Sequence, residues 1–188
     1  MKTALRYLLL SLFLAAISLV YAENNIYEDI DTKTESLIKK SDELIQKRQY
    51  ESAFTILGKD TTNKFIIYKK TEICINYFVQ SIGHRMFALH DLKENEDLYE
   101  LRSGTGSFNM YLYDPVEIIT DYYKKNQQSA IIEKTLGDYY YDVGLRYQGN
   151  WFETDDILAK KCIEHYEKAF AKKFYTVNML TNCADKYV

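Results

Sequence analysis

Apolar side chains recur every three or four residues along most of this chain, the spacing that places them on one face of an α-helix. The clearest run is Ile132, Leu136, Tyr140, Val143 and Tyr147, at spacings of 4, 4, 3 and 4. No useful stretch alternates apolar and polar residues, and one proline and seven glycines are too few turn-formers for a many-stranded sandwich. The sequence therefore predicts an all-α fold without a sheet.

The first 22 residues have the three parts of an export signal. Lys2 and Arg6 supply positive charge, residues 7–20 are apolar, and Val20 and Ala22 are the small residues expected before a cleavage site. We expect cleavage after Ala22, release into a periplasm or outside the cell, and no membrane span afterwards. The alternative is an uncleaved anchor, although 14 apolar residues are short for a span of about 20.

The rest of the chain predicts a flexible leader over 23–31 and a single helical domain over 32–188, with about seven or eight helices. Thr32 to Glu35 fits a capping box, so we expect Thr32 to cap the first helix. Further helix boundaries are predicted at Gly58, at residues 61–63 and at Asp114–Pro115.

Small and aromatic residues stand at fixed offsets on successive predicted helices. The first helix of one pair carries Leu136, Gly137 and Tyr140, and the second carries Cys162, Tyr166 and Ala169. This pattern resembles the tetratricopeptide repeat family, whose repeats are antiparallel helix pairs stacked into an α-solenoid. The resemblance covers Thr34 to Val188 and places Ser41 and Gly137 where two helices approach closely. The alternative is an unrelated helical bundle.

In that family the first helices of the pairs line a groove that binds a protein or peptide. The resemblance assigns these groove positions to Asp42, Lys69, Asn76, Lys134, Asp138, Tyr141, Asn178 and Asp185. Such a groove is mildly acidic and would suit an extended or helical peptide that carries lysine or arginine. The alternative is that these residues form ordinary solvated helix faces.

Several kinds of chemistry lack their sequence signals. The net charge is −3 and no basic cluster occurs, so we expect no nucleic-acid partner. The three histidines stand at no metal-ligand spacing, and no nucleophile-elbow motif occurs, so we expect neither a metal nor another cofactor. Cys74, Cys162 and Cys183 are interpreted as small buried hydrophobes, with a Cys162–Cys183 disulfide as the alternative.

These observations favour a non-enzymatic module that binds a protein or peptide in the cell envelope. The alternative is a small exported hydrolase that cleaves cell-wall glycans through a carboxylate pair, since 27 acidic residues allow many pairs. An enzyme should show a deep pocket with converging carboxylates of shifted pKa, whereas a binding module should show a shallow groove.

Overall fold

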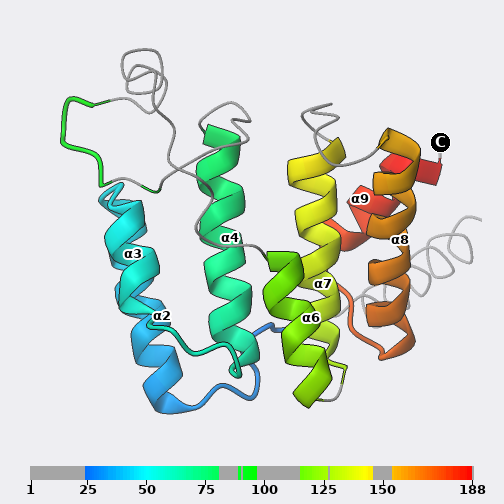
Figure 1. Cartoon of the computed structure of the whole chain (residues 1–188), viewed down its shortest axis with the longest axis horizontal. Helices are drawn as coiled ribbons and strands as arrows, with labels where there is room; N and C mark the ends of the chain where they lie inside the picture. The colour runs from blue at the N-terminus through cyan, green and yellow to red at the C-terminus, as the bar shows by residue number, and fades with distance from the viewer. Residues whose placement is uncertain are drawn as a thin grey trace, which may run out of the picture.

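The computed structural model describes residues 24–80, 89, 91–96, 115–126, 128–145 and 154–187 (Figure 1). Within these ranges the chain forms seven α-helices and no β-strand, which confirms the predicted all-α fold. The helices are α2 (Thr32–Gln46), α3 (Tyr50–Ile56), α4 (Lys64–Gln80), α6 (Pro115–Lys125), α7 (Ala130–Tyr139), α8 (Asp155–Ala171) and α9 (Val177–Tyr187). The predicted export signal and the predicted cap Asp114 lie outside the described residues.

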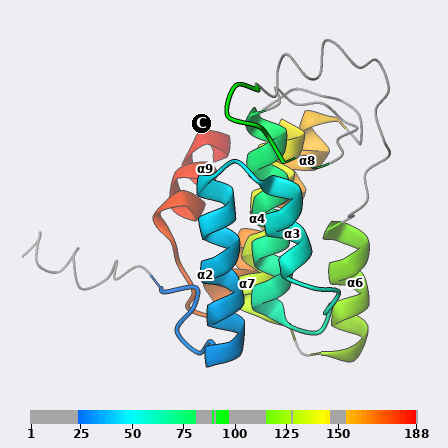
Figure 2. The same ribbon diagram turned by 90° about the vertical axis from the view of Figure 1, so that its left-hand side faces the viewer.

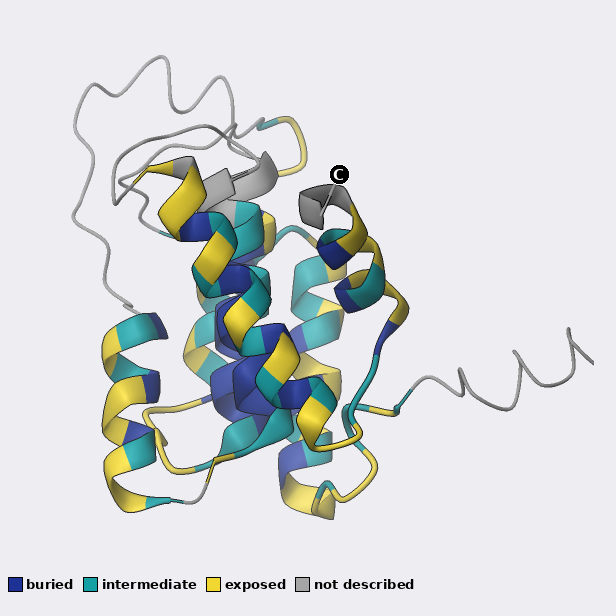
Figure 3. Cartoon of the chain, turned by 90° about the vertical axis from the view of Figure 1, so that its right-hand side faces the viewer, coloured by how far each residue is buried: buried dark blue, intermediate teal, exposed yellow. Residues whose placement is uncertain are grey.

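The helices lie side by side, and α4 packs on α7 as well as on α6. Figure 1 shows α2 and α3 at one side, α4, α6 and α7 in the middle, and α8 and α9 at the other side. Seen from the α2 side, α3 lies beside α2, with α4 and α7 behind them (Figure 2). Buried residues gather between the helices and exposed residues line their outer faces (Figure 3). No helix in the described ranges is long and apolar enough to span a membrane.

Polar side chains mark the helix ends near the N-terminus. The predicted cap Thr32 is wrong, because Asp31 fills that position: its Oδ1 accepts the Thr34 N–H at 2.9 Å and its Oδ2 accepts the Thr34 hydroxyl at 2.6 Å. An aspartate is the better cap because its charge also favours the positive end of the helix dipole. The helix end predicted at Gly58 is confirmed, because Gly58 stands just beyond the end of α3 and has a φ of +74°.

Residues 24–31, the described part of the segment 23–31 that was expected to be a flexible leader, contact the rest of the protein at two places. The Asn24 N–H donates to the Tyr175 carbonyl at 3.0 Å, and the Asn24 Oδ1 accepts the Tyr175 N–H at 2.7 Å. Ile26, Tyr27 and Ile30 pack on the cluster that α2, α3 and α4 bury together. Apolar side chains in this otherwise acidic segment therefore join the core.

Two small residues allow close helix approaches. Ser41 is fully buried, and its hydroxyl donates to the Ala53 carbonyl at 2.9 Å, which ties α2 to α3. Gly137 on α7 lies against Tyr166 on α8, and a Cβ at Gly137 would stand 2.3 Å from Cε1 of that ring. Two of the helix pairs thus meet through a residue with little or no side chain.

The helix predicted from the run of Ile132 to Tyr147 changes its hydrogen-bonding pattern at Tyr140. An α-helical hydrogen-bonding pattern runs to Tyr139, and a π-helical turn, η1 (Tyr140–Leu145), follows it. A π-turn accommodates an additional residue per turn and thereby changes the directions of the side chains. Tyr139 is buried in the core, whereas the Tyr140 ring stacks on His165 with centroids 5.7 Å apart.

The three cysteines are buried and form no disulfide bond. Cys162 and Cys183 belong to one apolar cluster of α8 and α9, together with Tyr166 and Met179. The alternative of a Cys162–Cys183 disulfide is therefore wrong for this structure, and the interpretation of the cysteines as small buried hydrophobes is confirmed.

Candidate functional site

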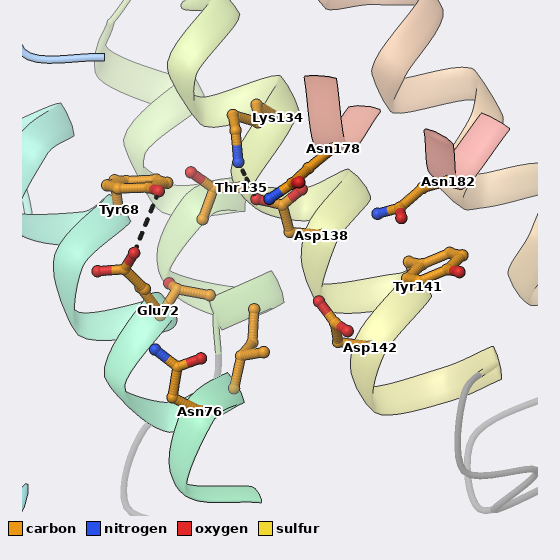
Figure 4. A pocket seen from close by; sticks show the side chains of 12 residues that line it. Tyr68, Glu72, Asn76, Lys134, Thr135, Asp138, Tyr141, Asp142, Asn178 and Asn182 are labelled. Carbon is orange, nitrogen blue, oxygen red and sulfur yellow. Dashed lines mark hydrogen bonds and ion pairs between the residues drawn. The ribbon is translucent and has the colours of Figure 1, made fainter. Parts of the chain in front are cut away.

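A cavity of about 480 Å³ lies between α4, α7 with η1, and α9 (Figure 4). We call it the polar pocket, because hydrogen-bonding side chains dominate its walls. Each helix presents residues one turn apart, since an interval of four residues returns to the same helix face. The main polar residues are Tyr68, Glu72 and Asn76 from α4, Lys134 and Asp138 from α7, Tyr141 and Asp142 from η1, and Asn178 and Asn182 from α9.

One chain of charged contacts reaches the α4 wall of the polar pocket. Lys69 Nζ lies 2.5 Å from Asp42 Oδ1 and 2.6 Å from Glu72 Oε2. The other oxygen of Glu72 accepts the Tyr68 hydroxyl at 3.4 Å. Burial alone would lower the pKa of Lys69, but Glu72 and Asp42 outweigh it and the pKa is raised. Lys69 therefore keeps its charge and holds Glu72 in place.

A second chain of contacts crosses the α7 wall. Lys134 and Asp138 form an ion pair over one helical turn. The Tyr166 hydroxyl donates to Asp138 Oδ1 at 2.8 Å, and it accepts from Asn182 Nδ2 at 3.0 Å. Burial raises the pKa of Asp138, against the opposing effects of Lys134 and Tyr166. This chain joins α7, α8 and α9 beneath the polar pocket.

The two chains meet across the cavity. The Lys134 ammonium lies 5.3 Å from the centroid of the Tyr68 ring, a cation–π distance. Figure 4 shows Tyr68 and Glu72 on α4 facing Lys134 and Asp138 on α7 across this space. Tyr68, Glu72, Lys134 and Asp138 are thus held in place by contacts with other groups of the protein.

The structure brings together most of the residues that the sequence predicted for a groove. Those that line the polar pocket are Asn76, Lys134, Asp138, Tyr141 and Asn178. Asp42 and Lys69 lie behind the α4 wall and connect to it through Glu72. Asp185 belongs to α9, but its side chain is outside the described residues.

Sequence reasoning missed several residues of the polar pocket, including Tyr68, and three of them are Glu72, Asp142 and Asn182. A signal for them was present, because each stands four residues from a predicted groove residue: Asn76, Asp138 and Asn178, respectively. Extending each predicted position by one helical turn would have found all three.

A separate polar cluster lies between α6, α7 and α8. Glu133 is 1% exposed; its Oε1 accepts the Tyr123 hydroxyl at 2.8 Å, and its Oε2 lies 2.7 Å from His165 Nδ1. Burial alone would raise the pKa of Glu133, but the hydrogen bonds from His165 and Tyr123 outweigh it and the pKa is lowered. Among the described residues, no group of three or more His, Cys, Asp or Glu side chains could hold a metal ion.

Comparisons with known proteins add no relative. No protein-family model, no curated protein and no solved structure matches the chain. The resemblance to tetratricopeptide repeats therefore remains a prediction from the positions of Gly137, Tyr166 and their sequence neighbours.

Proposed function

We propose that this protein is an exported, non-enzymatic module that binds a protein or peptide partner in the cell envelope through the polar pocket. The observation that carries the proposal is the cavity of about 480 Å³ with hydrogen-bonding side chains on three helical walls. Asn76 and Asn178 line it and are exposed, so the cavity meets the surface where a partner can reach it. Concave sites with a few converging polar groups are the usual places of ligand recognition.

The contacts inside the pocket support binding more than acid–base chemistry. Both oxygens of Glu72 have partners, Tyr68 and Lys69, and both oxygens of Asp138 have partners, Lys134 and Tyr166. A general acid or base must reach the proton it transfers, and these carboxylates already accept hydrogen bonds from the protein. Such side chains are suited to hold a fixed shape, which reduces the entropy that binding costs.

A crosslinking experiment tests the proposal. A photoreactive phenylalanine analogue replaces Tyr141 in the pocket wall, and the protein is expressed in its own envelope. In a second sample Asn178→Arg fills the pocket from α9. The matched control is Thr181→Arg, an exposed position on the same helix that does not line the pocket. We expect one stoichiometric crosslinked partner, lost with Asn178→Arg and kept with Thr181→Arg. A crosslink that survives Asn178→Arg, or the absence of any crosslink, would contradict the proposal.

One observation favours the hydrolase as a second candidate. Burial raises the pKa of Asp138, and the nearby charge of Glu72 raises it further, as in sites that keep a carboxylic acid protonated. Asp142 lines the same cavity and would be the second carboxylate. Release of soluble sugars from envelope glycans by the wild type, abolished in Asp142→Asn, would support this candidate. Equal release by both proteins, or none, would remove it.

A further inference from the structure

We infer that the polar pocket receives a positively charged side chain of the partner, the guanidinium of arginine or the ammonium of lysine; this inference rests on the proposed function. The balance of charge in the pocket favours a cation. The pocket and the two series of contacts behind its walls contain four carboxylates, which are Asp42, Glu72, Asp138 and Asp142. They contain two ammonium groups, which are Lys69 and Lys134. The excess negative charge attracts a cation.

The existing hydrogen bonds of the two ammonium groups disfavour an anion. Both ammonium groups already donate to carboxylates, Lys69 to Asp42 and Glu72, and Lys134 to Asp138. A partner carboxylate would have to compete with these contacts for the only ammonium group, Lys134, among the described lining residues. The pocket is therefore poorly matched to an anion.

The pocket wall also contains hydrogen-bond acceptors. The amide nitrogen of Asn182 donates to Tyr166, so the acceptor Oδ1 is the remaining polar atom of that amide. Asp142 adds a carboxylate on the neighbouring wall, and Figure 4 shows both side chains beside Tyr141. Guanidinium and ammonium groups donate several hydrogen bonds and accept none, which complements such a wall.

The size of the cavity also fits a long side chain. About 480 Å³ is more than a single ion needs and leaves room for such a side chain. Tyr141 lines the pocket, and aromatic rings attract cations over their faces. The Tyr68 ring, on the opposite wall, already has the Lys134 ammonium 5.3 Å from its centroid.

A titration followed by nuclear magnetic resonance tests the inference. The probes are four peptides that share one neutral sequence and differ in a central arginine, lysine, citrulline or glutamate. Citrulline keeps the shape of arginine without its charge. Agmatine, titrated alone, tests whether a free cation suffices without a peptide. The signals to follow are the side-chain amides of Asn76, Asn178 and Asn182, which line the pocket.

We expect the arginine and lysine peptides to bind at least about tenfold more tightly than the citrulline and glutamate peptides, the size of one charge-assisted hydrogen bond. Asp142→Asn should weaken the binding of the arginine peptide by about the same factor. Asp121→Asn is the control, because it removes the same charge from an exposed ion pair on α6. A loss of affinity for the arginine peptide in both variants would indicate only the long-range electrostatic field of the protein. It would overturn the assignment of the cation to the pocket.

Other outcomes separate this inference from the proposed function. Equal binding of all four peptides, or no binding of the cationic pair, would overturn the cation assignment. The proposed function would still stand if the crosslinked partner depends on Asn178. Shifts with agmatine equal to those with the arginine peptide would overturn the assignment to a partner side chain and identify a small cation as the ligand. Thermal melting of each variant checks that it is folded.

Discussion

Gly137 provides the sharpest test of how α7 and α8 pack. By helix propensity alone, Gly137→Ala should stabilise an α-helix by about 1 kcal/mol, because alanine loses less backbone entropy. The structure predicts the opposite sign. A Cβ at this position would lie 2.3 Å from Cε1 and 2.4 Å from Cδ1 of Tyr166. Carbon atoms in contact prefer about 3.5 to 4.0 Å, so the ring would have to move by more than about 1 Å.

Tyr166 has little freedom to move. It is fully buried, and its hydroxyl has hydrogen bonds to Asp138 at 2.8 Å and to Asn182 at 3.0 Å. Overpacking a core costs about 1 to 3 kcal/mol, and displacing these hydrogen bonds puts the substitution near the upper end of that range. After the gain in propensity, Gly137→Ala should lower the free energy of unfolding by about 2 kcal/mol. For a domain of this size, that corresponds to a Tm lower by about 4 to 8 °C.

Calorimetry and urea unfolding of the purified protein measure this effect. Thr181→Ala is the control for propensity, because Thr181 is exposed on α9. Tyr166→Leu supplies the second test: in its background, Gly137→Ala should cost less, with a coupling of about 0.5 to 3 kcal/mol. A Gly137→Ala protein that melts at or above the wild-type temperature would refute the close approach of α7 and α8.

Two further predictions concern polar contacts. Because its pKa is lowered, the Glu133 carboxylate adds stability above its unfolded-state pKa of 4.5, and this is lost as the pH falls through the folded-state pKa. Between about pH 6 and about pH 3.5, the unfolding free energy of Glu133→Gln should therefore fall less than that of the wild type. An equal fall in the two proteins would contradict this role of Glu133. Asn63→Ala should cost about 1 kcal/mol, because Asn63 Oδ1 accepts the N–H groups of Phe65 at 3.0 Å and Ile66 at 3.3 Å. Hydrogen exchange of those two amides should accelerate, and unchanged exchange would rule out the cap.

Local signals in the sequence predicted many helix boundaries. Gly58, Asn63 and Pro115 each stand at the end that their backbone or capping chemistry favours. The exact start of α2 was missed because Asp31 and Thr32 are adjacent residues that can both cap, and only the contact with Thr34 distinguishes them. The π-turn at Tyr140 was missed because consecutive tyrosines satisfy an apolar pattern in any register.

The site was partly predictable for a different reason. Helical spacing brings Lys134 and Asp138 together, and a sequence shows that spacing directly. The contact of Lys69 with Asp42 joins two different helices, so it depends on how α2 and α4 pack. Glu133 and His165 are likewise from different helices, and no short motif connects them. Ion pairs within one helix were therefore accessible to sequence reasoning and ion pairs between helices were not, although the resemblance did place Ser41 and Gly137 at close helix approaches.

The hydroxyl of Tyr166 also sets the register of the last helix. It donates to Asp138 on α7 and accepts from Asn182 on α9, so one hydroxyl group of α8 connects three helices. If α9 slid along its axis by one turn, about 5.4 Å, the contact with Asn182 would be lost. Asn178 lies one turn from Asn182 on α9. Its position in the wall of the polar pocket therefore depends on the same contact with the Tyr166 hydroxyl. The Tyr166 oxygen, together with the buried contacts of Met179 and Cys183, thus holds one wall of the polar pocket in place.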